Sequence, residues 1–156
     1  MGDSVHSENL GERTVELRLP SRLGYERIAM DAATSIARRM GFSAARIESL
    51  RTAIGEAVTN AIEHGNALDA TSRVVVILAI EDQSLVVSVA DQGHKHLDAT
   101  RITHDPQIAD VLKSPEKGGW GMWLIRELVD QVEITQRAGG GNQVRMVIHL
   151  EQSPDC

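Results

Sequence analysis

The sequence has one cysteine, few aromatic residues and no long apolar run. Because Cys156 is the last residue, no disulfide can form within the chain, and a reducing, cytoplasmic location is expected. Residues 1–10 are polar and lack the layout of a secretion signal. The longest apolar run covers residues 74–80, whereas a membrane-spanning helix needs about 20 apolar residues. These features exclude a disulfide scaffold and argue against a membrane protein.

The chain has 156 residues and a mass of 17.0 kDa, enough for one domain with its own core. Aromatic residues make up 3%, so aliphatic side chains must fill that core. The 22 acidic and 16 basic residues give a net charge of −6. This charge argues against nucleic acid or an anionic membrane as the main partner.

The hydrophobic periodicity predicts an α+β fold, a two-layer sandwich whose mixed or antiparallel sheet is covered on one face by helices. We expect one domain over residues 14–150, a flexible segment at 1–13 and a tail at 151–156. The expected strands cover residues 14–19, 73–81, 85–90, 132–137 and 143–150, and the expected helices cover 21–40, 43–64 and a stretch after Gly118.

Two serines are expected to cap the first two helices, Ser21 at the first and Ser43 at the second. The first helix is expected to bury the apolar residues at helical spacing, which are Leu23, Ile28, Ala32, Ile36 and Met40. Residues 91–117 have no strong periodicity. A stretch of this length inside a domain is either disordered or a functional lid, and we expect a lid over about 94–118.

The second predicted helix carries Glu56, Asn60 and His64 at intervals of four residues, which places them on one stripe. Small and apolar neighbours indicate that the stripe lies at the margin of the core. An amide oxygen suits Mg²⁺, and a carboxylate can accept a proton from an attacking hydroxyl. An ordinary polar helix face would give the same spacing.

Two glycine-containing segments could bind parts of a nucleotide. Asp91-Gln92-Gly93 follows a predicted strand, where an aspartate can accept a hydrogen bond from an exocyclic amine; a plain turn would have the same residues. Gly118-Gly119-Trp120-Gly121 precedes a helix, where free backbone N–H groups bind anions, and Lys117 adds a positive charge. A loose helix entry is the alternative. Residues 139–142 are interpreted as a hairpin turn.

Together, a helix with Glu-x-x-x-Asn, a strand followed by Asp-x-Gly, and Gly-x-Gly at a helix resemble the Bergerat nucleotide-binding fold of the GHKL superfamily. The segment Gly55–Asn66 and the run that begins Gly-Gly-Trp-Gly-Met-Trp resemble the anti-sigma factor serine-protein kinases of the RsbW type. The resemblance covers residues 14–150. One departure is Lys95, where many members of the superfamily have a second glycine.

The resemblance implies a kinase that uses ATP, releases ADP and requires Mg²⁺. It implies Glu56 as the general base and Asn60 as the Mg²⁺ ligand. By the same resemblance, Asp91 binds the adenine amine with Gly93 beside the ring. The phosphates contact Gly119 and Gly121, with Lys117 nearby.

The resemblance also implies protein partners. The substrate is a serine of an anti-sigma-factor antagonist of the STAS type, and a sigma factor is held inactive. A homodimer is expected, with Arg27 on the first helix as a candidate partner contact. His64 is expected to pack behind the site. No direct contact with nucleic acid or membrane is expected.

The sequence also bears on other classes of protein. The chain lacks the separate phosphoacceptor hairpin of a histidine kinase and the transducer domain of gyrase-like ATPases. A binding module that sequesters a sigma factor or antagonist without catalysis is the main alternative. A zinc site at His94, His96 and His104 would lack an evident fourth ligand.

Overall fold

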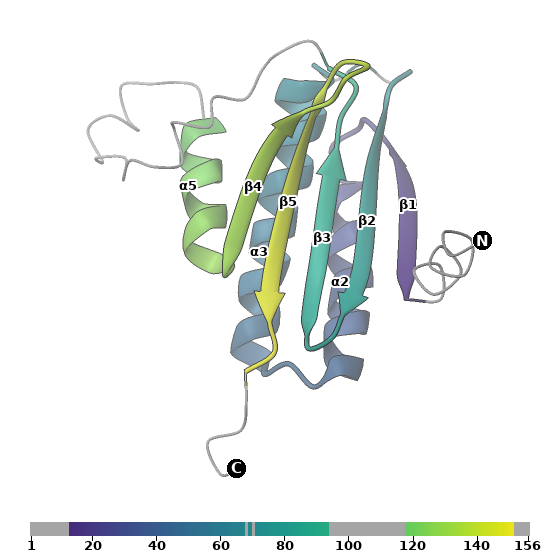
Figure 1. Cartoon of the computed structure of the whole chain (residues 1–156). Helices are drawn as coiled ribbons and strands as arrows, with labels where there is room; N and C mark the ends of the chain where they lie inside the picture. The colour runs from purple at the N-terminus through teal and green to yellow at the C-terminus, as the bar shows by residue number, and fades with distance from the viewer. Residues whose placement is uncertain (1–12, 68, 70, 94–117, 152–156) are drawn as a thin grey trace, which may run out of the picture.

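Five strands form one sheet in the order β1-β2-β3-β5-β4, and every neighbouring pair is antiparallel. The computed structural model describes residues 13–67, 69, 71–93 and 118–151 (Figure 1). The strands are β1 (Thr14–Pro20), β2 (Arg73–Glu81), β3 (Ser84–Ala90), β4 (Gln131–Gln136) and β5 (Asn142–His149).

The helices lie together on one face of this sheet, so the predicted two-layer α+β sandwich is confirmed (Figure 1). They are α2 (Glu26–Met40), α3 (Ala44–Asn60) and α5 (Gly118–Leu128). A single π-helical turn, η1 (Ala61–Gly65), continues α3. In the middle of the helical layer, α3 packs against α2 on one side and α5 on the other.

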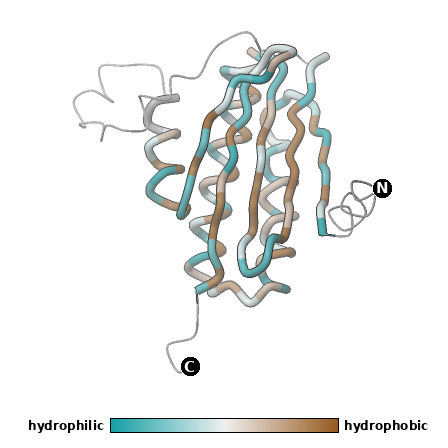
Figure 2. Tube along the Cα trace, viewed as in Figure 1, coloured by the Kyte–Doolittle hydropathy of each residue, from teal (hydrophilic) through white to brown (hydrophobic). Residues whose placement is uncertain are grey.

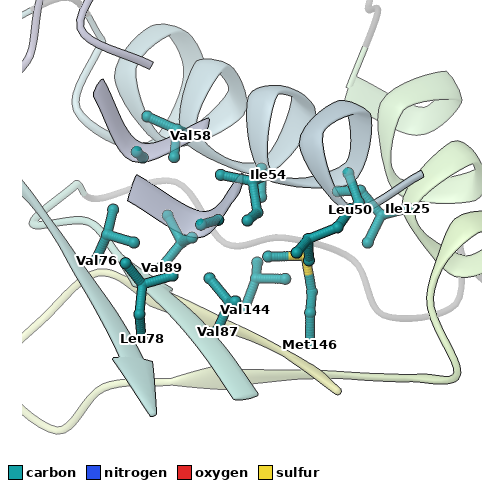
Figure 3. Close-up of a cluster of buried hydrophobic side chains, with 14 of the residues drawn as sticks. Leu50, Ile54, Val58, Val76, Leu78, Val87, Val89, Ile125, Val144 and Met146 are labelled. Carbon is teal, nitrogen blue, oxygen red and sulfur yellow. The ribbon is translucent and has the colours of Figure 1, made fainter. Parts of the chain in front are cut away.

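The core lies between the two layers and is almost entirely aliphatic, as the shortage of aromatic residues requires. Leu50, Ile54 and Val58 of α3 project onto the central strands and are at most 1% exposed (Figure 3). The strands contribute alternate residues such as Val76, Leu78, Val87, Val89, Val144 and Met146. Figure 2 shows the most hydrophobic colouring along β2 and β3, in the middle of the sheet.

The first predicted helix differs from the expectation at its start. Ser21 does not cap it: the helix begins at Glu26, and Ser21 is 1% exposed and donates a hydrogen bond from Oγ to the Ser72 carbonyl oxygen at 3.1 Å. Leu23 and Ile28, which were expected to be buried, are 55% and 47% exposed.

The residues of α2 that enter the core are instead three alanines, Ala29, Ala33 and Ala37, each with 0% exposure. Their small side chains allow α2 to lie close to the sheet and to α3. Of the expected apolar stripe, Ala32, Ile36 and Met40 pack at the edge of the core and are only partly buried.

The second predicted helix begins as expected, because Oγ of Ser43 accepts a hydrogen bond from the backbone N–H of Arg46 at 3.2 Å. Its end departs from α-helical geometry in η1. There the N–H of Asn66 donates to the carbonyl oxygen of Ala61 at 2.8 Å, five residues back. Over the described ranges of the chain, no helix combines the length and apolarity needed to span a membrane.

Candidate functional site

Two residues of α3 meet the first turn of α5. Glu56 is half-buried and Asn60 is 7% exposed, and both lie on the side of α3 that packs against α5. A Cβ placed on Gly121 would lie 2.9 Å from Oε2 of Glu56 and 3.1 Å from Nδ2 of Asn60. Because Gly121 has no side chain, the backbone of α5 comes directly up to the carboxylate and the amide.

The glycine segment belongs to α5 itself, since the helix begins at Gly118 instead of after Gly121. Gly119 and Gly121 are therefore residues of its first turn. The first N–H groups of an α-helix have no partner within the helix, and they carry a partial positive charge. This end of α5 is thus suited to an anion. Lys117 and the predicted lid lie outside the described residues.

Asp91 is buried at the end of β3, with 3% exposure. Its Oδ1 accepts hydrogen bonds from the backbone N–H of Gly93 at 2.9 Å and of Asn142 at 3.1 Å. The backbone N–H of Asp91 donates to the Asn142 carbonyl oxygen at 3.0 Å. The carboxylate is thereby fixed between its own turn and the start of β5.

Burial raises the pKa of Asp91, because removing the carboxylate from water disfavours its charged form. The bonds from Gly93 and Asn142 oppose this effect, as does the positive charge of Arg137. A guanidinium N–H of Arg137 also donates to the Asp91 carbonyl oxygen at 3.2 Å. A buried acceptor of this kind suits an N–H donor from a ligand.

The turn η1 joins the two groups of residues. It starts after Asn60, and its last residue, Gly65, lies against the Asp91 carboxylate and against Gly93. Because η1 is π-helical, the regular α-helical spacing on which the stripe was predicted ends at Asn60, before His64. Among the residues that the structure describes, buried Nε2 of His64 has no hydrogen-bond partner, and it lies 3.8 Å from Oε2 of Glu63.

Sequence interpretation missed the contribution of the β4–β5 turn. Residues 139–141 do lie in the predicted hairpin turn, and Asn142 already begins β5. Gly141 also lies against Asp91, and the backbone N–H of Asn142 donates to the Asp91 carboxylate. Asn142 is 1% exposed. An amide at the start of a strand, directly after glycines, was the signal available in the sequence.

The predicted site residues are thus brought together in part. Glu56, Asn60 and Gly121 form one group, and Asp91 with Gly93 forms the other, one π turn away. Arg27 is exposed on α2, outside both groups. The three histidines of the zinc alternative lie outside the described residues. Within the described residues, no three His, Cys, Asp or Glu side chains are grouped as metal ligands.

A buried carboxylate acceptor, a helix end suited to an anion and a carboxylate–amide pair are the parts that a nucleotide site needs. Residues 19–148 match the family model described as a histidine kinase-like ATPase domain. The chain belongs to this family. Membership implies ATP as the ligand, and it confirms the GHKL-type fold inferred from the motifs.

Within this family, the chain is similar to proteins named serine-protein kinase RsbW. The protein from Bacillus licheniformis is 34% identical over 148 residues, covering 90% of this chain and 89% of that protein. The protein from Oceanobacillus iheyensis is 28% identical over 128 residues, covering 80% of each. The resemblance to the RsbW type is thereby confirmed.

A solved structure has the same fold. It contains the RsbU and RsbW domains of a Mycobacterium tuberculosis protein, with a TM-score of 0.64 and 22% identity. The alignment covers 90% of this chain and 33% of that one, so this chain spans about a third of the solved protein.

Proposed function

We propose that this protein is an Mg²⁺-ATP-dependent serine-protein kinase of the RsbW type that acts in the cytoplasm. It transfers the γ-phosphate of ATP to a serine of a STAS-type anti-sigma-factor antagonist, and it sequesters a sigma factor when free. The observation that carries this proposal is the contact of Glu56 and Asn60 with the first turn of α5 at Gly121. This contact brings a carboxylate and an amide to a helix end that is suited to an anion.

The two ends of the nucleotide have separate partners in this proposal. Asp91 accepts a hydrogen bond from the exocyclic amine of adenine, and Gly93 lies beside the ring. The phosphates lie at the N-terminus of α5, where Gly119 and Gly121 expose backbone N–H groups and Lys117 supplies a positive charge. The raised pKa of Asp91 comes from the same burial that strengthens a hydrogen bond to it.

The donor set at Asn60 fits Mg²⁺. Within the described part of the chain, its amide makes one weak hydrogen bond, from Nδ2 to Sδ of Met122 at 3.7 Å. The bond uses the nitrogen and leaves the amide oxygen as a hard, neutral ligand. Mg²⁺ held by Asn60 would offset the negative charge of the phosphates during phosphoryl transfer.

Glu56 is the general base. Its carboxylate accepts the proton of the substrate serine as the hydroxyl oxygen bonds to the γ-phosphorus and the bond to the ADP oxygen breaks. Glu56 lies one helical turn before Asn60 on the same side of α3, so proton acceptance and phosphate binding are adjacent. His64 is assigned no chemical step and packs behind the site in this proposal.

Partner binding is assigned to the exposed side of α2. Arg27 is exposed there, and its guanidinium is available for an acidic group of the antagonist or of the sigma factor. We expect the protein to act as a homodimer.

Calorimetric titration with ATP and ADP, with and without Mg²⁺, tests the nucleotide site. We expect Mg²⁺-dependent binding by the wild type and strong loss of that dependence in Asn60→Ala. Absence of ATP binding by the wild type would overturn the proposal.

Transfer of labelled phosphate from ATP to a STAS-type antagonist tests the chemistry. Glu56→Gln should keep ATP affinity while transfer falls by roughly 10²–10⁴-fold, the usual contribution of a general base. The matched control is Glu48→Gln, an exposed residue of the same helix, which should transfer normally. If the wild type binds ATP and antagonist without any transfer, the non-catalytic binding module replaces the kinase.

A further inference from the structure

Asn66 is a buried amide with an unusually complete set of partners. It follows η1 directly and is 4% exposed. Its Nδ2 donates to Oγ of Ser21 at 2.7 Å and to the Arg73 carbonyl oxygen at 3.1 Å. Its Oδ1 accepts the backbone N–H of Gln92 at 2.7 Å. One side chain thus joins the turn after β1, the start of β2 and the segment that follows β3.

The bond to Gln92 fixes the middle residue of Asp91-Gln92-Gly93. The side chain of Gln92 returns to the same area, where its Oε1 accepts the backbone N–H of Arg73 at 3.1 Å. The residue before Asn66 is Gly65, whose backbone lies against both Asp91 and Gly93. The segment is therefore held on this side by η1 and Asn66.

The opposite side of the segment is held by β5. There the backbone of Asn142 exchanges hydrogen bonds with the backbone N–H and the Oδ1 of Asp91. The two sides are independent, since one depends on the start of β5 and the other on a side chain from the end of the α3–η1 helix. The direction of the Asp91 carboxylate depends on both.

We propose that Asn66 is a positioning residue that orients the Asp91 carboxylate toward the exocyclic amine of adenine and so sets the selectivity for the base. This inference rests on the proposed function, in which Asp91 binds adenine. Asn66 itself does not touch the nucleotide. It acts through its Oδ1, which holds the Gln92 backbone, whereas its two N–H bonds join the turn after β1 to the start of β2 and contribute to stability.

The physical consequence is a preference for adenine over guanine. Guanine has a carbonyl oxygen where adenine has the amine, so a correctly directed carboxylate attracts adenine and repels guanine. If the Asp91 turn shifts, the hydrogen bond to adenine lengthens and the repulsion of guanine weakens. ATP and GTP have the same triphosphate, so the ratio of their affinities isolates this effect from changes at the phosphates.

The test is calorimetric titration of the full chain with Mg²⁺-ATP and Mg²⁺-GTP, together with thermal unfolding of each variant. In Asn66→Ala the ratio of ATP to GTP affinity should fall about tenfold or more, as expected for losing a well-directed bond to a charged acceptor. In the matched control Ser21→Ala, the bond from the backbone N–H of Gln92 to Oδ1 of Asn66 remains. That variant should lose stability but keep the ratio within about twofold of the wild type.

A purely structural role for Asn66 predicts a different pattern. Asn66→Ala would then lower the melting temperature and leave the ATP-to-GTP ratio unchanged, and this result overturns the inference. If Asn66→Ala does not fold, Asn66→Asp and Ser21→Ala decide. Asn66→Asp keeps an oxygen that accepts from Gln92 but loses the two N–H donors, so its melting temperature should fall while its ATP-to-GTP affinity ratio stays close to that of the wild type. If the ratio falls together with the melting temperature in both Asn66→Asp and Ser21→Ala, the inference is overturned. Failure of wild-type ATP binding is distinct, because it overturns the proposed function as well.

Discussion

The carbonyl oxygen of Gly65 lies directly against the Cα of Gly93, so that a Cβ on Gly93 would overlap it. Gly65 ends η1, and Gly93 ends the segment that carries Asp91. This approach connects the helix that carries Glu56 to the turn that carries Asp91. The backbone positions on both sides are fixed, so a side chain has no space to enter.

We therefore expect Gly93→Ala to disrupt the site. The added methyl group must push the two backbones apart, which costs roughly 1–3 kcal/mol of folding stability in an overpacked position. ATP affinity should fall because Asp91 moves with the turn. Gly139→Ala is the control, since a Cβ at Gly139 meets nothing within 4 Å. Equal ATP affinity and melting temperature in the two variants would contradict the close approach.

Asp91→Asn should lower the affinity for ATP without lowering the stability of the nucleotide-free protein. Burial raises the pKa of Asp91, so at neutral pH its ionised form costs folding free energy. An amide keeps the shape and an oxygen for the N–H groups of Gly93 and Asn142, so the melting temperature of the nucleotide-free protein should stay level or rise. ATP affinity should fall by roughly tenfold or more, because the charged acceptor is lost.

The pH dependence of this variant has a definite sign. The folded-state pKa of Asp91 is above its ordinary value of 3.8, so the folded protein takes up the proton first as pH falls. The cost of the buried charge is present at neutral pH and disappears as pH falls through the raised pKa. Unfolding of the wild type and Asp91→Asn should therefore converge at acidic pH. A gap that widens as pH falls would contradict the buried charge.

The sequence predicted those parts of the fold that depend on local patterns. The β-rich run at residues 73–81 and the serine cap at Ser43 identify elements that the structure contains. Glu56 and Asn60 were recognised because α-helical spacing alone puts them on one side of α3. The resemblance to the GHKL superfamily supplied the order of the motifs. In the structure, Gly121 lies against the side chains of Glu56 and Asn60.

The errors occurred where a residue's role depends on a distant partner. Ser21 has the local pattern of a helix cap, but its hydroxyl bonds to Asn66, which lies 45 positions along the chain. Asn142 looked like a turn residue, and its contact with Asp91 spans 51 positions. The π turn after Asn60 was also missed, since spacing arguments assume a regular α-helix. Such contacts are set by packing and leave little trace in local sequence.

Gly121→Ala should affect chemistry more than nucleotide binding. The new Cβ would lie 2.9 Å from Oε2 of Glu56 and 3.1 Å from Nδ2 of Asn60. Because Glu56 is a flexible, half-buried side chain, it can move aside and the protein should still fold. A carboxylate displaced from its position is a poorer base, so phosphate transfer should fall by about tenfold to a hundredfold while ATP affinity changes less. Transfer at the wild-type rate would contradict the role of this contact.

A cluster of hydrogen bonds around Arg46 lies at the other end of the sandwich, away from the candidate site. A terminal guanidinium nitrogen of Arg46 donates to Oδ2 of Asp130 and to the carbonyl oxygen of His149, each at 2.7 Å. The backbone N–H of His149 donates to the same carboxylate oxygen at 2.7 Å. These bonds attach the first turn of α3 to the residue before β4 and to the last residue of β5.

Arg46→Ala should lower the free energy of unfolding by about 1–3 kcal/mol, since it removes two charge-assisted bonds of a side chain that is 20% exposed. Arg18→Ala is the control, because its ion pair with Glu16 is exposed on β1 and should contribute little. ATP affinity should be unchanged in both. Chemical denaturation measures the difference.

This stabilisation should depend on pH in the opposite sense to that of Asp91. Burial alone would raise the pKa of Asp130, but the bonds from the His149 N–H and Arg46, with the charge of Arg46, lower it below its ordinary value of 3.8. A lowered carboxylate pKa gives stability that is complete above the unfolded-state pKa and is lost as pH falls through the folded-state pKa. The difference between wild type and Arg46→Ala should therefore be constant near neutral pH and shrink below about pH 3.8. A difference that persists in strong acid would show that Arg46 stabilises the fold by packing its carbon chain and not by its bonds to Asp130.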